Sequence, residues 1–360
     1  MELSAVRAEL PVLDRDAYLN AGTFGPLPRR TAEAMERRLA RDLAEGRSGT
    51  AYFEEVLELR AQVRGALAGL ISAPDGSIAL TSSTTDGCNI AVNALRLGPD
   101  DEIVTTDLEH PGLEGALRVS GARLRVVELR TTSPDEALAA FEAAITPRTR
   151  LIALSHVAWT NGAVMPVREL AGRGIPLLVD GAQGAGAIPV DVGELDCDFY
   201  TVSAQKWLLG PDSTGCLYVR PELVDDLRVT FPSFVSWKRW TFELAPGAPR
   251  FEPGWIPTGS LEGLLASLRF ADEAGAERFG RARAAAERCR ELVAERARMV
   301  TPPGQATLVS FAPEEDPADL VAALAATGVV IRDLPSLGWA RASVGFWTSD
   351  DDLERLAAGL

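Results

Sequence analysis

The sequence has little of the material from which metal sites, disulfide frameworks and membrane anchors are built. Its 360 residues include only four cysteines and two histidines. The cysteines are widely scattered and form no CxxC pair, so neither a metal site nor a disulfide framework is expected. No run of about 18 apolar residues is present to span a bilayer, and the first 16 residues lack the apolar stretch of a secretory signal. We therefore expect a cytoplasmic protein.

Positive charge is also scarce in this chain. Lys and Arg together number 36 against 51 Asp and Glu, which gives a net charge of −15. Nucleic acids and anionic membranes are bound through clustered Lys and Arg side chains. The composition therefore argues against a nucleic-acid or membrane partner, and any anionic ligand has to be bound in a local basic pocket.

What the sequence does contain is a long alternation of apolar runs and helix-like stretches. Amphipathic patterns at residues 31–45 and 52–71 predict two helices ahead of it. The apolar runs lie at residues 77–81, 102–106, 124–129, 151–155, 176–179, 199–202 and 215–219. This alternation predicts an α/β fold with a mainly parallel sheet that is covered on both faces. One intervening helix, at residues 134–145, follows Ser133 and has Glu136 near its start, an arrangement typical of a capping box.

Changes in composition divide the chain into four parts. We expect an N-terminal segment that packs against the C-terminal lobe, a large domain, an aromatic active-site loop, and a long helix followed by a small α+β lobe. These parts are predicted at residues 1–19, 20–225, 226–259 and 260–360. The long helix should reach residue 298 with a break near Gly275 or Gly280. In the lobe, strands are predicted at 308–311, 329–332 and 341–346, and helices at 317–326 and 351–360.

Two ionisable residues follow strands of the predicted sheet. Asp180 comes directly after the apolar run 175–179, and Lys206 follows the run 199–202 after three small or polar residues. In open α/β sheets the carboxyl ends of strands are where ligands bind. The apolar residues after Lys206 predict a partly desolvated amine that can form a Schiff base with an aldehyde. From the residues alone, Asp180 could instead be a helix N-cap and Lys206 a surface lysine.

Six short motifs, in this order, resemble those of the class V aminotransferase family of fold type I pyridoxal-phosphate enzymes. They are TSSTTDG (81–87), EHPG (109–112), SHV (155–157), DGAQ (180–183), SAQKW (203–207) and RAS (341–343). The family includes cysteine desulfurases, cystine C–S lyases and isopenicillin N epimerase-like proteins. The resemblance covers residues 18–346 and implies a fold type I enzyme with a seven-stranded sheet, pyridoxal 5'-phosphate as cofactor, an amino-acid substrate, and a homodimer with active sites at the interface.

The resemblance also implies roles for residues that would contact the cofactor. Lys206 would bind its aldehyde and later take the substrate α-proton, Asp180 would keep its ring nitrogen protonated, and His110 would stack on the ring. Further cofactor contacts would come from Thr84, Thr85, Gln183, Ser203, Gln205 and, across the dimer interface, Thr258. Thr84 and Thr85 open a helix-like run, whose positive end favours a phosphate. Gln205 stands where the family commonly has a histidine.

Three residues would bind the substrate if the resemblance holds. Arg341 would hold the α-carboxylate, because its planar fork suits a carboxylate, although a strand-end arginine is otherwise often part of a surface ion pair. Trp159 stands where cysteine desulfurases usually have an asparagine, and the C–S lyases tolerate an aromatic residue there. Trp255 lies in the segment 251–260, which the family brings across the interface to the partner subunit.

The reaction is predicted from what lies near Arg341. Residues 329–340 contain no cysteine, and Cys289 lies in the predicted long helix, so a desulfurase mechanism that forms a persulfide on the enzyme is not expected. The leading hypothesis is a C–S β-lyase that converts cystine or an S-substituted cysteine to a persulfide or thiol, pyruvate and ammonia. An aminotransferase or an amino-acid epimerase is the alternative within the fold, because all three reactions begin with a carbanion at Cα. A noncatalytic ligand-binding or scaffold protein that retains the fold is the alternative from a different class.

Overall fold

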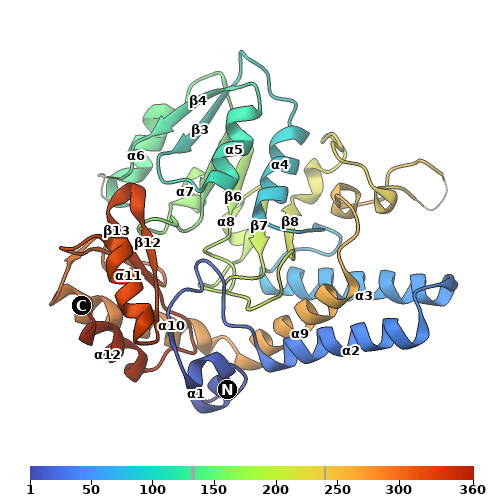
Figure 1. The fold of residues 1–360 in the computed structure, drawn as a ribbon. Helices are drawn as coiled ribbons and strands as arrows, with labels where there is room; N and C mark the ends of the chain where they lie inside the picture. Colours follow the sequence, from blue (N-terminus) through green and yellow to red (C-terminus); the bar gives the residue numbers. More distant parts are fainter. Residues whose placement is uncertain (131–133, 239–240) are drawn as a thin grey trace.

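Two sheets organise the computed structural model, which describes residues 1–130, 134–238 and 241–360 (Figure 1). The larger, called the large sheet, has the strand order β2-β8-β7-β6-β5-β3-β4. Its strands are β2 (Ile78–Thr81), β3 (Glu102–Thr106), β4 (Arg123–Val127), β5 (Thr149–Ser155), β6 (Leu177–Asp180), β7 (Phe199–Ser203) and β8 (Gly215–Val219). The strands from β4 to β7 are parallel to their neighbours, whereas β8 runs antiparallel to both β2 and β7. The predicted fold class and all seven predicted strands are confirmed, with ends that agree within two residues.

Helices cover both faces of the large sheet. In β5, Leu151 and Ala153 belong to the core with α4 and α5, whereas Ile152 and Leu154 belong to the core with α3 and α9. Because both faces are buried, the strand sequences are continuous apolar runs and do not alternate between apolar and polar residues. The helices around this sheet are α2 (Arg29–Glu45), α3 (Gly49–Leu70), α4 (Thr84–Ala94), α5 (Pro111–Val119), α6 (Pro134–Ala144), α7 (Val167–Leu170), α8 (Val192–Leu195) and α9 (Thr258–Ala274). The capping box predicted from Ser133 lies outside the described residues.

The second sheet, called the small sheet, is antiparallel and has the order β12-β13-β10-β9. Its strands are β9 (Arg298–Met299), β10 (Leu308–Ala312), β12 (Arg332–Leu334) and β13 (Trp339–Ser343), and the helices packed near it are α10 (Glu277–Ala294), α11 (Pro317–Ala326) and α12 (Asp350–Ala358). The predicted break in the long helix occurs at Gly275, whose φ of 73° is a left-handed conformation that favours glycine. The prediction that this helix reaches residue 298 was wrong, since α10 ends at Ala294 and a strand follows.

The strand predicted at residues 329–332 is also wrong, because two strands with different partners occupy this segment. β11 (Val329–Val330) pairs in parallel with β1 (Ala17–Tyr18), whereas β12 joins β13 in the small sheet. An apolar run shows that a segment is buried but not which strand it pairs with. The strand predicted at 341–346 instead spans Trp339–Ser343, and the Ser343 amide then donates to the Leu19 carbonyl at 2.7 Å.

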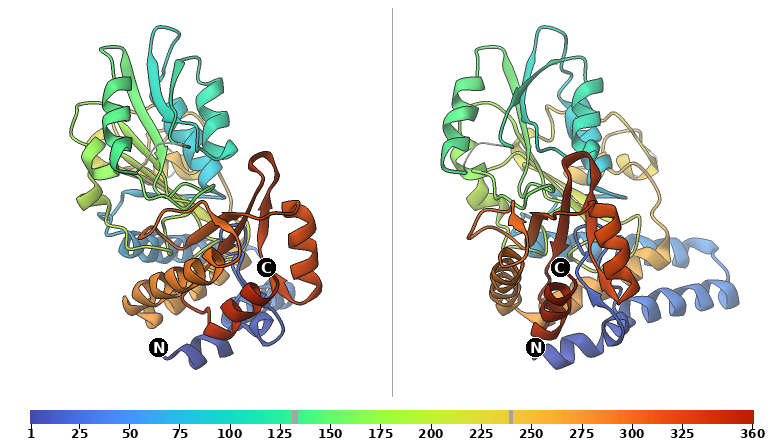
Figure 2. Two further views of the ribbon diagram at one scale, coloured as in Figure 1. Left: turned by 90° about the vertical axis from the view of Figure 1, so that its left-hand side faces the viewer. Right: turned by 60° about the vertical axis from the view of Figure 1, so that its left-hand side comes forward.

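The N-terminal segment lies against the C-terminal part of the chain. Arg7 in α1 (Leu3–Ala8) pairs with Asp352 of α12 at 2.6 Å, and Figure 2 shows these two helices close together. The segment 226–259 is largely irregular and includes short 3-10 turns at Phe234–Ser236 and Ala248–Phe251. No helix in the described part of the chain combines the length and the apolar character that a bilayer crossing needs.

Candidate active site

Lys206 and Asp180 lie at the carboxyl ends of neighbouring parallel strands. Asp180 ends β6, is only 3% exposed, and accepts a hydrogen bond from the Ala182 amide at 2.9 Å. Burial raises the pKa of Asp180, and Lys206 opposes this shift. Burial lowers the pKa of Lys206 to about 8, against the attraction of Asp180. The amine can therefore lose its proton near neutral pH, which a nucleophile or a general base requires. Lys206 is one of only two lysines in the chain.

His110 caps the helix that follows β3. Its Nδ1 accepts a hydrogen bond from the Gly112 amide at 3.0 Å, so the neutral ring carries its proton on Nε2. Burial, together with the nearby charges of Lys206 and the small-sheet arginines Arg332 and Arg341, lowers the pKa of His110 to about 4. The ring meets Trp159 edge to face, with centroids 5.3 Å apart. His110 is therefore a neutral ring at neutral pH.

Thr84 and Ser203 meet at the N-terminus of α4. The Ser203 hydroxyl accepts from the Thr84 amide at 2.9 Å and donates to Thr84 Oγ1 at 3.2 Å. Thr85 follows on the exposed side, and a Cβ on Gly112 would lie 2.5 Å from its Oγ1. Glycine at residue 112 therefore lets the start of α5 approach the start of α4. A helix N-terminus with hydroxyls beside it is a suitable place for a phosphate.

Gln183 and Gln205 connect the site to the N-terminal loop. Gln183 donates from Nε2 to the Gly22 carbonyl and accepts at Oε1 from Trp207 Nε1, both at 2.8 Å. These bonds leave one N–H of its amide for a cofactor oxygen. The Gln205 carbonyl accepts from the Gly25 amide at 2.7 Å, and a Cβ on Gly25 would lie 2.1 Å from the Lys206 carbonyl. The loop therefore lies directly against the backbone that carries the lysine.

Arg341 and Arg332 are register partners in the small sheet. Arg341 is fully buried, donates from Nη1 to the Trp159 carbonyl at 2.6 Å, and reaches Thr23 Oγ1 at 3.5 Å. Arg332 reaches the same Thr23 oxygen at 3.4 Å and lies over the Trp159 ring. Within the described residues, no carboxylate lies within 4.0 Å of either guanidinium. Sequence reasoning missed Arg332, although its place at the end of a predicted strand was a usable signal.

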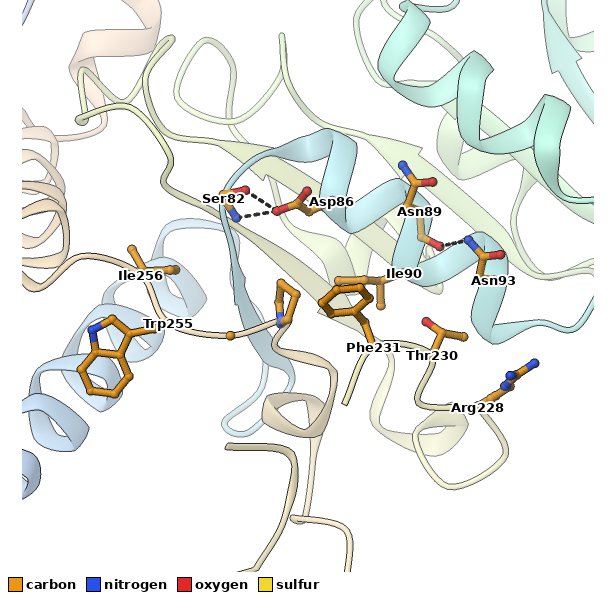
Figure 3. A pocket seen from close by; sticks show the side chains of 12 residues that line it. Ser82, Asp86, Asn89, Ile90, Asn93, Arg228, Thr230, Phe231, Trp255 and Ile256 are labelled. Atoms are coloured by element: carbon orange, nitrogen blue, oxygen red, sulfur yellow. Dashed lines mark hydrogen bonds between the residues drawn. The ribbon is translucent and has the colours of Figure 1, made fainter. Parts of the chain in front are cut away.

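Trp255 and Thr258 lie elsewhere in this chain. Trp255 is 45% exposed and packs against Phe234 with ring centroids 5.5 Å apart. It lines a cavity of about 750 Å³ along α4, where Figure 3 shows Phe231 near Ile90 and Trp255 set apart from both. Thr258 is the first residue of α9 and donates to Asp42 at 3.2 Å. No hydrogen bond, ion pair or ring contact in the described regions joins Trp255 or Thr258 to Lys206.

The arrangement fits the pyridoxal 5'-phosphate that the resemblance implies. Its aldehyde needs an amine with a lowered pKa, its ring nitrogen needs a buried anion, and its phosphate needs a helix N-terminus. Lys206, Asp180 and the start of α4 supply these groups. Buried polar atoms without a partner in the described structure include Gln205 Oε1, Trp159 Nε1 and Arg341 Nε. Such atoms have hydrogen bonds available for bound molecules. No group of three metal-ligating side chains was found in the described regions.

Comparisons with known proteins agree with this geometry. Residues 17–356 match the family described as aminotransferase class V. Isopenicillin N epimerase of Streptomyces clavuligerus is 31% identical, over 95% of this chain and 93% of that protein. A cysteine desulfurase of Serratia proteamaculans (strain 568) is 29% identical, over 99% of this chain and 97% of that protein.

Solved structures of C-DES, a cystine C–S lyase, have the same fold. A C-DES variant with glycine covalently linked to its PLP cofactor superimposes with a TM-score of 0.93 at 27% identity and covers 98% of each chain. The complex of C-DES with its reaction product cysteine persulfide gives a TM-score of 0.91, also at 27% identity, over 97% of this chain and 98% of that chain. Because the family model matches almost the whole chain, the chain belongs to the class V aminotransferase family and is a pyridoxal-phosphate-dependent enzyme.

Proposed function

We propose that this enzyme is a C–S β-lyase that acts on cystine or a related S-substituted cysteine. The observation that carries the proposal is the pair Arg332 and Arg341, two guanidinium groups in register with no carboxylate of the described residues within 4.0 Å. Like charges opposite each other in a sheet are unfavourable unless an anion balances them. Cystine has two carboxylates, one for each guanidinium, and this matches the two positive charges better than an amino acid with a single carboxylate.

The residues divide the chemistry among them. Arg341 would bind the α-carboxylate and Arg332 the distal one, which fixes the Cα–H bond relative to Lys206. When bound, pyridoxal 5'-phosphate supplies an electron sink that stabilises the negative charge at Cα. The Lys206 amine would take the α-proton. The Cβ–S bond then breaks, the sulfur leaves with the bonding electrons as a persulfide, and water completes the conversion of the remaining fragment to pyruvate and ammonia.

The cysteines support a lyase over a desulfurase. All four are free and buried, and burial raises the pKa of Cys197, Cys216 and Cys289 to about 12. Cys289 lies in α10, as the sequence predicted, and not on a loop near Arg341. A thiol accepts sulfur from a substrate as an accessible thiolate, which burial disfavours. The similarity in fold to C-DES, described as a cystine C–S lyase, supports the same conclusion.

Epimerisation is the second candidate, because isopenicillin N epimerase is 31% identical over most of the chain. An epimerase needs an acid that returns a proton to the opposite face of Cα. His110 is a poor acid for this purpose, since its pKa is lowered to about 4 and it is neutral at physiological pH. Transamination needs no such acid and is distinguished by its products.

The test is to incubate purified, cofactor-loaded enzyme with L-cystine and to measure pyruvate, ammonia and persulfide. We expect the three products in equal amounts, without an added 2-oxo acid. Turnover that depends on a 2-oxo acid and yields no pyruvate would establish an aminotransferase instead. Formation of the D-enantiomer, with deuterium from D₂O at Cα, would establish an epimerase.

We also propose that the enzyme is a cytoplasmic homodimer in which Trp255 and Thr258 reach the partner's active site. Support comes from an exposed aromatic cluster, in which Trp255 at 45% exposure contacts Phe53 and Phe234, at 38% and 48% exposure. Large exposed apolar clusters of this kind are typical of protein interfaces. Sedimentation equilibrium should give twice the chain mass of 38.4 kDa. A monomer with full activity would contradict this proposal.

A further inference from the structure

Glu109 is a buried carboxylate beside the candidate active site with no assigned role. It is 7% exposed and lies directly before His110. Its oxygens accept hydrogen bonds from Thr106 Oγ1 at 2.6 Å, from the Ser155 amide at 2.9 Å and from Ser155 Oγ at 2.6 Å. Every partner is neutral, and within the described residues no cation lies within 4.0 Å of its carboxylate. A buried carboxyl without a cation has a strong tendency to keep its proton.

The end of β5 connects Glu109 to Asp180. Ser155, its main partner, ends β5 and is the register partner of Asp180 at the end of β6. The next residue, His156, donates its amide to the Asp180 carbonyl at 2.9 Å. Glu109 follows β3 and Asp180 ends β6, the two neighbours of β5, so the end of β5 lies between these two buried carboxyl groups. Charges so placed interact strongly, and ionisation of one disfavours ionisation of the other.

The surrounding charges decide which carboxyl holds the proton. Lys206 faces Asp180 and favours its ionised form. On Glu109, Asp180 is the charged group that acts, and together with burial it raises the pKa to about 7. Burial raises the pKa of the Cys88 thiol in α4, and both carboxylates raise it too, so Cys88 is neutral. The neighbouring His110 is also neutral at neutral pH. Below about pH 7 Glu109 therefore holds its proton, whereas the charge on Lys206 favours the ionised form of Asp180.

We propose that Glu109 is a positioning residue: its protonated form favours the ionised form of Asp180, which would hold the ring nitrogen of the cofactor. The inference rests on the proposed role of Asp180 in holding the ring nitrogen and extends it to a second carboxyl that never touches the cofactor. As pH rises, Glu109 loses its proton and places a second negative charge beside Asp180. The ionised form of Asp180, which would hold the cofactor's ring nitrogen, is then less favoured, and Glu109 is the group whose charge has changed.

The test is a pH titration of the cofactor absorbance in the holoenzyme without substrate. We expect the wild-type spectrum to include a step near neutral pH and Glu109→Gln to lack it, because glutamine keeps the shape and cannot ionise. Thr106→Val removes one donor to the carboxylate and should move the step to higher pH. Glu114→Gln is the matched control, since Glu114 is a partly exposed α5 residue paired with Arg118. A step that persists in Glu109→Gln, or a spectrum without a step in the wild type, overturns the proposal.

A second measurement uses the apoprotein and does not depend on cofactor uptake. Because the pKa of Glu109 is raised on folding, its contribution to stability is greatest at low pH and is lost as pH rises toward 7. Between pH 5 and 8 the melting temperature of Glu109→Gln should therefore rise relative to that of the wild type. A constant difference would mean a purely structural role and would refute the inference. Enzyme that makes pyruvate from cystine but lacks the titration step refutes this inference alone, and enzyme with the step but no pyruvate refutes the proposed reaction alone.

Discussion

The two halves of the candidate site balance their charges differently. At the large sheet, Lys206 and Asp180 carry opposite charges and each moderates the pKa of the other. At the small sheet, Arg332 and Arg341 carry the same charge and are register partners, and no carboxylate in the described part of the chain lies within 4.0 Å of them. In the large-sheet half the two charges balance each other without substrate. In the small-sheet half the two positive charges need an anionic ligand to balance them. We therefore propose cofactor chemistry for the first half and substrate selection for the second.

The two halves are nevertheless joined by a few hydrogen bonds. Arg341 donates to the Trp159 carbonyl, which follows β5 of the large sheet, and both arginines reach Thr23 of the N-terminal loop. The same loop contacts Gln183 through Gly22. A substrate held by the arginines is therefore positioned relative to the lysine by the large sheet and the N-terminal loop together.

Removing the lysine should have the largest effect and should leave the arginine half intact. In Lys206→Ala we expect no covalent attachment of the cofactor and a loss of turnover of about 1000-fold or more. Borohydride reduction of the wild type should fix the cofactor to the chain at one site, located by peptide mass spectrometry. Lys238→Ala is the matched control, because Lys238 is the only other lysine and forms an exposed pair with Glu243. Cofactor attachment at Lys238, or full activity of Lys206→Ala, would contradict the assignment of cofactor chemistry to the large-sheet half.

Removing one arginine should affect substrates according to their charge. Arg332→Gln loses a hydrogen-bonded ion pair to the distal carboxylate, which is worth about 1.5–3 kcal/mol, or about 10- to 100-fold in KM for cystine. S-methylcysteine has a single carboxylate, so its KM should change little, and the cofactor spectrum should not change. Arg332→Lys should recover part of the affinity for cystine because it restores the charge. An equal rise in KM for both substrates would show that Arg332 does not select the second carboxylate.

Much of the large-sheet half could be predicted from the sequence, because it depends on local patterns. Asp180 and Lys206 follow apolar runs of strand length, and the carboxyl ends of parallel strands meet at one edge of a sheet. His110 was expected near the cofactor, but its part in capping α5 was visible only once Nδ1 could be placed against the Gly112 amide.

The small-sheet half was harder to predict, because it depends on which strands pair. Arg332 is opposite Arg341 only because β12 pairs with β13, whereas β11, just before it in the chain, pairs with β1. An apolar pattern does not encode that change of partner. The position of Trp255 depends in the same way on packing against Phe53 and Phe234, residues that are far from each other in the sequence. Its proposed role depends on a second copy of the chain, which one sequence does not describe.

The smallest predicted effect concerns the link between the halves. Trp207→Phe removes the donor to Gln183 Oε1, which links the lysine segment to the N-terminal loop. Losing this buried hydrogen bond should cost about 1 kcal/mol and lower the melting temperature by about 2 °C. Trp347→Phe is the matched control, because Trp347 is equally buried but its Nε1 has no partner in the described structure. Both changes replace an indole with a smaller phenyl ring, so the additional decrease in melting temperature in Trp207→Phe measures the contribution of the hydrogen bond. Equal losses in thermal unfolding of the two variants would mean that Gln183 does not couple the cofactor half to the substrate half.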